Sequence, residues 1–426
     1  MPHQKSLATG THLPYTLFFV NKFNWLDASP MATVSTFSTY ALAEQGQHTT
    51  LIIEGDTAAA SDELLKEKFG LAPRPNYRVK LLQRKIFGKV KSSEIFFLRA
   101  VGHILKNSPD GKRVVVITRN TTFLFYLVML KKLFGFTVLF EAHGYHGTVN
   151  LPNLPLRPPL SFLQRYSSYR LLEQFLLNQC SGLICITRPQ CQLYRADFVK
   201  IPTAVLPLGS RPPEMKTAAL PQFSKKRLVY IGRLTTHIDV DLMIQAIKAI
   251  ASDGISLVWV GLKSGDIEVL AKKIREAGLP EGAFLLKGWM AHKDMAALLR
   301  EETSVGLATY KPTYRSAVVT CPTKIFDYYA VGLPVIAAKL PTVEDLVTDG
   351  HHGVLYDTAN AHESLVAAIS RLCTDEALYS KMQASVLAAA EYFSWQNRAK
   401  RLISFAQAIQ SGNAQKYASC NFVRPL

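Results

Sequence analysis

Two cationic side chains lie where an anion could be bound. Arg233 comes directly after Gly232 at the end of an apolar run, and Lys324 follows Thr323 at the start of a helical pattern. A helix N-terminus with an ammonium group beside it favours phosphate, because its backbone N–H groups are unpaired and its dipole end is positive. This placement predicts a phosphate site, and a solvated cation in an exposed turn is the alternative for each residue.

Three groups that can exchange protons follow another predicted strand. Glu141, His143 and His146 come directly after the apolar run 137–140. Histidine titrates near neutral pH and can act as a general base or orient a hydroxyl group. One of the two histidines is therefore expected at a reaction site, and a purely structural histidine is the alternative.

The elements that would position these residues form a repeating pattern of strands and helices. Short apolar runs, unbroken by polar residues, are typical of strands covered on both faces, and helices between such strands indicate a parallel sheet. The expected strands cover 15–20, 49–53, 113–117, 137–140, 183–186, 228–231, 256–260, 283–286, 305–308 and 334–337. The fold class is therefore α/β, and ligands should bind at the carboxyl ends of the strands.

A break in this pattern divides the chain. The segment 207–223 is rich in proline and has no periodicity, so it is expected to be a linker. We predict two doubly wound, Rossmann-like domains: an N-terminal domain over 1–212 and a second domain over 213–395. An amphipathic helix near 395–410 opens the remaining segment, 396–426, and is expected to pack back across the boundary.

Composition and charge limit the possible functions. Hydrophobic residues make up 48% of the chain and charged residues 19%, which is typical of a globular protein and argues against disorder. The first 212 residues hold 25 Lys and Arg against 12 Asp and Glu, whereas the rest holds 24 against 20. A positive field on one side indicates that the N-terminal half meets an anionic partner.

Cysteines and leader segments indicate the compartment. None of the six cysteines has a spacing typical of zinc, so free thiols in a reducing compartment are expected. The first 30 residues lack the layout of a signal peptide, and no apolar run approaches the ~18 residues of a transmembrane helix. We expect a cytoplasmic protein that associates peripherally with the inner face of a membrane.

The second half resembles a known family. Residues 322–357, PTKIFDYYAVGLPVIAAKLPTVEDLVTDGHHGVLYD, look like the donor-binding segment of GT-B glycosyltransferases, particularly family 4, also called glycosyltransferase group 1. Further matching segments occur in the family's order at 229–234, 258–266, 286–299 and 393–402. The N-terminal half resembles the family more loosely, through 140–147 (FEAHGYHG) and 182–210. The resemblance implies a GT-B fold with two domains facing a central cleft.

The resemblance also implies roles at the donor site. Arg233 and Lys324 would hold the diphosphate, whose negative charge grows as the glycosidic bond breaks. Asp327 stands where the family has a glutamate that accepts hydrogen bonds from the ribose hydroxyls. Trp289 and Met290 would lie in the loop that holds the base.

The N-terminal residues would face the donor sugar and the acceptor. His143 would donate a hydrogen bond or orient the acceptor, and His146 could take that part. A reaction that inverts the anomeric centre needs a general base, for which His143, His146 or Glu141 could serve. A retaining reaction, usual in family 4, mainly needs charge stabilisation at the departing phosphate.

Because the sequence departs from the family at two positions, the identity of the transferred sugar is not determined. Ile238 stands where the family usually has a second lysine, and Val319 stands where it often has a glutamate touching the sugar. A UDP-sugar is the expected donor and a GDP-sugar the next choice. No permanently bound cofactor or metal is expected, because the sequence lacks the Asp-x-Asp motif of metal-dependent transferases.

A basic segment indicates a membrane surface. Seven Lys and Arg residues, from Arg74 to Lys91, alternate with apolar residues and no acid. Read as a helix with one basic and one apolar face, this segment would bind anionic lipid at about 1 kcal/mol per basic residue near the surface. A solvated face over an ordinary core is the alternative.

The expected function is transfer of a sugar to a lipid-linked or polysaccharide acceptor in surface glycan synthesis. One alternative is a catalytically weak GT-B partner subunit, which Ile238 and Val319 keep open, and a GT-B epimerase is another. A third is a polyanion-binding protein, although no nucleic acid is expected because no nucleic-acid-binding motif is present.

Overall fold

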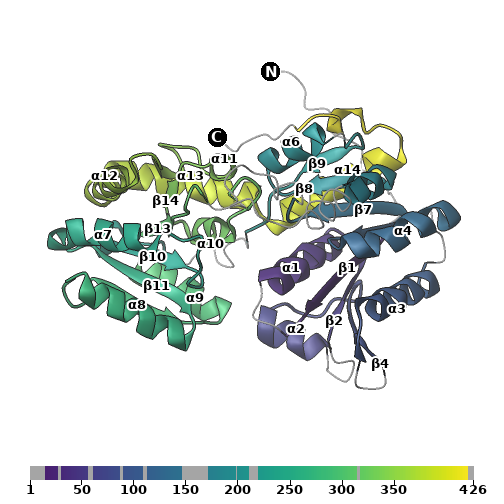
Figure 1. Cartoon of the computed structure of the whole chain (residues 1–426), viewed down its shortest axis with the longest axis horizontal. Helices are drawn as coiled ribbons and strands as arrows, with labels where there is room; N and C mark the ends of the chain where they lie inside the picture. The colour runs from purple at the N-terminus through teal and green to yellow at the C-terminus, as the bar shows by residue number, and fades with distance from the viewer. Residues whose placement is uncertain are drawn as a thin grey trace, which may run out of the picture.

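The computed structural model describes residues 15–26, 30–55, 61–86, 90–108, 113–145, 171–197, 199–210, 219–313 and 317–420. These residues form two α/β domains that lie side by side, and the C-terminal helix, drawn in yellow, lies against the N-terminal domain (Figure 1). The predicted fold class, two Rossmann-like domains with parallel sheets, is confirmed.

The described part of the N-terminal domain contains a seven-stranded parallel sheet in the order β3-β2-β1-β6-β7-β8-β9. Its strands are β1 Thr16–Asn24, β2 His48–Glu54, β3 Tyr77–Leu82, β6 Val114–Thr118, β7 Thr137–Ala142, β8 Gly182–Cys185 and β9 Thr203–Val205. The helices with printed bounds are α1 Pro30–Glu44, α2 Ser61–Phe69, α3 Ser93–Lys106, α4 Thr121–Phe134 and α6 Arg188–Ala196, and residues 171–179 are also helical.

The first strand explains why unbroken apolar runs predicted this sheet. Leu17 and Phe19 belong to one hydrophobic core, whereas Phe18 and Val20 belong to the core on the other face. Side chains alternate between the two faces of a strand, so a strand buried on both faces needs apolar residues throughout.

The C-terminal domain has a parallel sheet in the order β12-β11-β10-β13-β14-β15. Its strands are β10 Arg227–Ile231, β11 Ser256–Leu262, β12 Phe284–Gly288, β13 Val305–Ala308, β14 Val335–Ala338 and β15 Gly353–Tyr356. The helices around it are α7 Val240–Ile250, α8 Ser264–Glu276, α9 His292–Glu302, α10 Thr323–Val331, α11 Pro341–Glu344 and α12 Ala361–Thr374.

Both sheets have a point where the strand order reverses, between β1 and β6 and between β10 and β13. The connections leaving such neighbours run to opposite faces of the sheet, which opens a crevice at the carboxyl ends. The functional side chains should therefore be sought just after β1, β6 and β7 and just after β10 and β13.

Two C-terminal helices return the chain to the N-terminal domain. Helix α13 covers Glu376–Tyr392, and α14 covers Trp395–Gln410, the helix expected near the end of the chain. Helix α14 packs against α1 and lies so close to β8 that a Cβ atom on Gly182 would come within 2.6 Å of Ile409. The crossing helix is therefore an integral part of the N-terminal core.

The basic segment is not the amphipathic helix that we expected. It forms the edge strand β3 and a small antiparallel pair, β4 Lys85–Ile86 with β5 Val90–Lys91. Arg78 and Lys80 on β3 are exposed, whereas Arg84 pairs with Glu54 at 2.7 Å. The alternation of basic and apolar residues in YRVKLL has a period of two, which suits a half-exposed edge strand.

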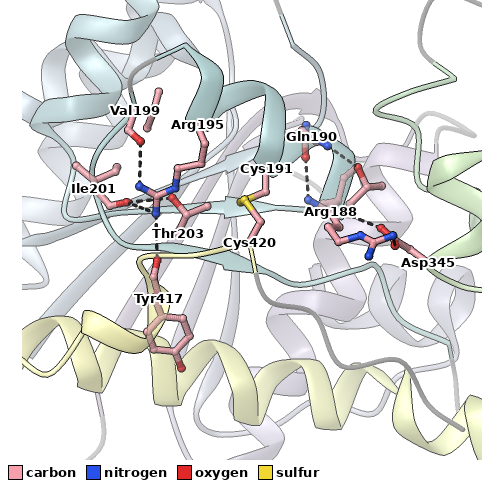
Figure 2. Close-up of a disulfide and its surroundings, with 12 residues drawn as sticks. Arg188, Gln190, Cys191, Arg195, Val199, Ile201, Thr203, Asp345, Tyr417 and Cys420 are labelled. Carbon is pink, nitrogen blue, oxygen red and sulfur yellow. Dashed lines mark hydrogen bonds and ion pairs between the residues drawn. A yellow bond between two sulfur atoms is a disulfide. The ribbon is translucent and has the colours of Figure 1, made fainter.

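The expectation of free thiols throughout is wrong for two of the six cysteines. Cys191 on α6 forms a disulfide with Cys420, which lies in the segment after α14 (Figure 2). The pair is separated by 229 positions in the sequence, so spacing alone could not have indicated it. The bond fastens the C-terminal segment to the N-terminal domain.

Candidate active site

A buried carboxylate organises the carboxyl edge of the N-terminal sheet. Glu141, at the end of β7, is fully buried and receives hydrogen bonds from two arginines. Arg119, directly after β6, donates from Nη2 at 2.6 Å and from Nε at 3.0 Å to Oε1. Arg398 of α14 donates from Nη2 to Oε2 at 2.9 Å. Both guanidinium groups are also buried, so the Glu141 carboxylate forms ion pairs with two positive charges.

The two arginines extend this cluster into neighbouring elements. Arg398 also donates to the Pro207 carbonyl and to Ser38 Oγ on α1, at 2.9 Å each. Arg119 reaches Ser35 Oγ on α1 at 3.3 Å. Strand β7, helix α1, the chain after β9 and the crossing helix therefore meet at one carboxylate. Although burial raises the pKa of Glu141, the charges of Arg119 and Arg398 hold that pKa well below its usual range.

His143 lies beside this cluster, where the strand end was predicted to place it. Its Nε2 atom is 2.7 Å from Glu141 Oε1, and its side chain is 15% exposed. Burial lowers the pKa of His143 to about 4, the charge of Arg119 adds to this, and Glu141 acts in the opposite direction. The imidazole is therefore neutral at pH 7, with its proton on Nε2 facing the carboxylate, which leaves the Nδ1 lone pair as an acceptor.

This histidine should give stability a distinctive pH dependence. The folded pKa is lowered from 6.5 to about 4, so the unfolded chain binds a proton in that window and the folded chain does not. The contribution of His143 to the free energy of unfolding is therefore fully present above pH 6.5 and is lost as the pH falls towards 4. Between pH 7 and pH 5 this loss amounts to about 2 kcal/mol. Between pH 7 and pH 5 the free energy of unfolding of the His143→Gln variant, measured in urea, should therefore fall by about 2 kcal/mol less than that of wild type.

The exposed His362 supplies the control for that measurement. Its side chain is 45% exposed, so His362→Gln should keep the wild-type pH dependence. If the free energy of unfolding fell equally in wild type and His143→Gln between pH 7 and pH 5, His143 would have its ordinary pKa in the folded protein.

A second cluster lies at the carboxyl edge of the C-terminal sheet. Gly232 follows β10 with φ +146°, and its carbonyl accepts a hydrogen bond from the Trp259 indole at 2.8 Å. Lys324, in the first turn of α10, is buried, and its Nζ would lie 3.8 Å from a Cβ atom on Gly232. The structure thus brings Lys324 to the glycine turn that directly precedes Arg233, the other residue proposed for the phosphate site. Lys324 and Gly232 are 92 positions apart in the chain.

Aromatic rings surround the Lys324 ammonium group. It donates to the Tyr230 hydroxyl at 2.5 Å and lies 3.7 Å from the Tyr230 ring centroid and 4.8 Å from that of Tyr310. Burial holds the pKa of Lys324 well below its usual range, and the charge of Asp327 opposes that effect. A desolvated amine of this kind gains from an incoming anion, because the anion stabilises its charged form.

The other residues that the family resemblance assigned to a donor site lie near this cluster or beyond it along the same edge. Thr323 is exposed at the start of α10, and Asp327 is half-buried one turn later. Arg233, directly after Gly232, has an exposed side chain. Trp289 follows β12 and is 68% exposed, whereas Met290 is partly buried against the core.

The two departures from the family are both buried. Ile238 and Val319 are each 2% exposed, so neither position presents a polar group to a ligand. The adjacent His237 ring stacks on Tyr310 at 6.0 Å between centroids. Burial lowers the pKa of His237, and the charge of Lys324 adds to this.

Cys321 lies two residues before α10 and is buried. Burial raises the pKa of this thiol to about 12, and the Leu208 backbone and the charge of Arg398 act against burial. A direct ion pair joins the domains, because Arg188 Nη2 lies 3.0 Å from Asp345 Oδ1.

Sequence reasoning missed Arg119 and Arg398. His146, which was proposed as the alternative to His143, lies outside the described residues. Arg119 directly follows a predicted strand, and that position was the available signal. Arg398 lies in a segment that the family resemblance covered, without a role for the residue. Among the described residues, no three His, Cys, Asp or Glu side chains gather as metal ligands.

Residues 225–375 match the family described as "Glycosyl transferases group 1". A D-inositol 3-phosphate glycosyltransferase of Stackebrandtia nassauensis is 26% identical over 262 residues, 56% of each chain. A chitobiosyldiphosphodolichol beta-mannosyltransferase of Candida glabrata is 30% identical over 118 residues, 27% of this chain and 24% of that protein. The alignments thus span about half or less of these relatives.

Solved structures share the fold over almost the whole chain. Anabaena HepE, solved in complex with UDP-glucose, aligns with a TM-score of 0.64 and 14% identity, covering 92% of this chain and 99% of that one. The sucrose-phosphate synthase of Thermosynechococcus elongatus aligns with a TM-score of 0.68 and 15% identity, covering 93% and 99%.

Proposed function

Since the chain belongs to the group 1 glycosyl transferases and has the GT-B fold, we propose that it transfers a sugar from a nucleotide-sugar donor to an acceptor. The observation that carries the proposal is the buried Lys324 amine at the Gly232 turn. A desolvated amine, a glycine turn and a helix N-terminus converge there, and together they suit a diphosphate. A UDP-sugar is the proposed donor, because HepE was solved with UDP-glucose.

The donor would lie along the carboxyl edge of the second sheet. Lys324 and Arg233 neutralise the diphosphate as it departs, and the Thr323 hydroxyl and the first N–H groups of α10 contact it. Asp327 accepts hydrogen bonds from the ribose hydroxyls, which suit a carboxylate because each oxygen can take one donor. Trp289 and Met290 hold the base. Stabilising the leaving group in this way lowers the barrier without a bound metal.

His143 would act on the acceptor side of the reaction. With its proton on Nε2 facing Glu141, Nδ1 can accept a hydrogen bond from a hydroxyl group. The pKa of about 4 makes His143 a weak base, which favours orientation of the acceptor over full proton removal. Glu141 has both oxygens occupied by arginines, so we propose that it positions His143. These assignments suit a retaining reaction.

Nucleotide binding tests the donor site directly. Thermal unfolding should be measured with UDP, GDP, ADP and buffer; a ligand at 100 times its dissociation constant adds about 2.7 kcal/mol. We expect a shift with UDP that Arg233→Gln weakens and that the exposed Arg275→Gln on α8 leaves unchanged. A cooperative unfolding transition whose melting temperature no nucleotide shifts would contradict the proposal. It would favour the alternative of a catalytically weak partner subunit, for which the buried Val319 and Ile238 are the evidence.

The acceptor would be a lipid-linked or growing surface glycan, reached at the inner face of a membrane. Helix α4 exposes three large apolar side chains at helical spacing: Phe125, Met129 and Leu133. The helical residues 171–179 lie beside it, since Lys131 Nζ donates to the Gln179 carbonyl at 2.9 Å, and they expose Leu171, Leu172 and Phe175. No helix among the described residues is long and apolar enough to span a membrane.

Charge favours a bilayer as the partner of this apolar face. The N-terminal half carries the excess of Lys and Arg, including the exposed Lys132 on α4 and Arg78 and Lys80 on β3. Apolar side chains that enter the headgroup region, together with nearby cations, bind anionic membranes. The basic edge and the α4 face would share this contact.

Vesicle co-sedimentation measures that contact. The variant Phe125→Ser/Met129→Ser/Leu133→Ser should lose most binding to phosphatidylglycerol vesicles while its far-UV circular dichroism stays native. The exposed Val269 of the second domain supplies the control, and Val269→Ser should bind as wild type does. Undiminished binding of the triple variant, or equal binding to phosphatidylcholine alone, would contradict the membrane assignment; tight, salt-sensitive RNA binding would favour the polyanion alternative.

A further inference from the structure

Helix α6 carries a buried glutamine that reaches back to the His143 turn. The side chain of Gln190 is 0% exposed. Its Nε2 atom donates to the Ala142 carbonyl at 3.2 Å and to the Gly144 carbonyl at 3.0 Å. Those carbonyls belong to the residues on either side of His143. Its Oε1 atom accepts from the Ile186 backbone N–H at 2.9 Å, which fixes the orientation of the amide.

A second side chain of the same helix supports this turn. Tyr194, one helical turn after Gln190, donates its hydroxyl to the Gly144 carbonyl at 3.0 Å. The carbonyls that flank His143 are thus held from α6, whereas the His143 ring is held by Glu141 from β7. A buried side-chain amide is expensive to leave unpaired, so its bonds restrict the turn to one conformation.

Helix α6 is itself fixed at several points (Figure 2). Its first residue, Arg188, pairs with Asp345 of the second domain, and the Arg188 backbone N–H donates to Asp345 Oδ2 at 3.0 Å. Cys191 is joined to Cys420, and Arg195 donates to the Tyr417 carbonyl at 3.1 Å. The helix that holds the His143 turn is therefore anchored to both the other domain and the C-terminal segment.

We propose that Gln190 is a positioning residue for sugar transfer, which holds the backbone on both sides of His143 so that the imidazole faces the reacting sugar. This inference rests on the proposed function, because it assigns Gln190 through His143. It predicts that Gln190 acts on the transfer step and leaves donor binding in the second domain unchanged.

The test compares two glutamines of one helix. Gln190→Met keeps the size of the side chain and removes its hydrogen bonds, and Gln190→Glu replaces the two N–H donors with an acceptor. Gln192 is exposed two positions later, so Gln192→Met is the matched control. We expect kcat to fall about 10- to 100-fold in both Gln190 variants, with the donor KM and the UDP thermal shift unchanged. Gln192→Met should behave as wild type.

A second readout does not depend on activity. Arg119, Glu141 and Arg398 all face His143, so the proton resonances of its ring report whether it stays in that cluster. In wild type, His143, assigned by its absence in His143→Gln, should titrate near pH 4. In Gln190→Met its midpoint should move towards 6.5, the ordinary value.

The two readouts separate the possible failures. If wild type transfers no sugar from any nucleotide sugar, the proposed function fails, and the His143 titration still decides whether Gln190 holds the turn. An unchanged kcat and an unchanged His143 midpoint in Gln190→Met would overturn the proposal. A lower melting temperature with normal kcat would likewise overturn it, because a purely structural role predicts that result.

Discussion

Replacing Lys324 with methionine is expected to abolish UDP binding and lower kcat about 100-fold or more, while the melting temperature stays equal to that of wild type or rises. Removing one preorganised group that stabilises transition-state charge commonly costs 100- to 1000-fold in kcat. The unliganded protein, by contrast, holds this amine buried against aromatic rings, where burial lowers its pKa. An apolar side chain of similar length removes that desolvation cost.

The same residue should couple donor binding to a proton. A bound diphosphate would raise the lowered pKa of Lys324, so UDP binding should take up a proton near and above the pKa of the free site, and affinity should fall as pH rises. Calorimetry in two buffers of different ionisation enthalpy measures the uptake. Lys324→Met should abolish it, and Lys272→Met, at a side chain that is 72% exposed on α8, should keep it. Normal UDP affinity in Lys324→Met would remove this residue from the donor site.

Replacing Glu141 with glutamine is expected to cost about 3–5 kcal/mol of stability, the typical effect of removing one partner from a buried ion pair. Arg119 and Arg398 would remain as two buried cations without their shared carboxylate. Because Arg398 belongs to α14, hydrogen exchange in that helix should also accelerate. Urea unfolding gives the free energy, and exchange measured by mass spectrometry locates the loosened helix.

A surface glutamate controls for the loss of one charge. Glu302 pairs with Lys287 at 3.4 Å, and its side chain is 38% exposed, so Glu302→Gln should cost less than about 1 kcal/mol. A cost for Glu141→Gln as small as that of the control would mean that the two arginines find other partners. A large loss of stability in Glu141→Gln with unchanged hydrogen exchange in α14 would mean that the effect is confined to β7.

Local patterns in the sequence determined most of the sheets. The ten strands expected from apolar runs all form, and α14 begins at Trp395, where its helix was expected to begin. The strands that were missed are β3, β9 and β15, which lie at edges of the two parallel sheets, and the two-residue strands β4 and β5. On β3 the exposed Arg78 and Lys80 interrupt the apolar run that marks a central strand, whereas β9 and β15 have only three and four residues and are too short to stand out.

The candidate donor site could also be predicted in part. A cation at a helix start and a glycine turn after a strand are local signals, and the family resemblance placed both at one ligand. That Lys324 would be buried against Tyr230 and Tyr310 could not be predicted, because those rings belong to β10 and to the chain after β13. The pKa of the amine depends on that enclosure.

Only the tertiary structure decided how the N-terminal cluster is built. Arg398 and Glu141 are 257 positions apart, and Cys191 and Cys420 are 229 apart. The sequence indicated that Glu141 and His143 follow a strand, but it did not indicate that two arginines would neutralise the carboxylate or that Gln190 would hold the turn. Hydrophobic periodicity reports which face of an element is buried, whereas the partner of a buried charge depends on which distant element folds against it.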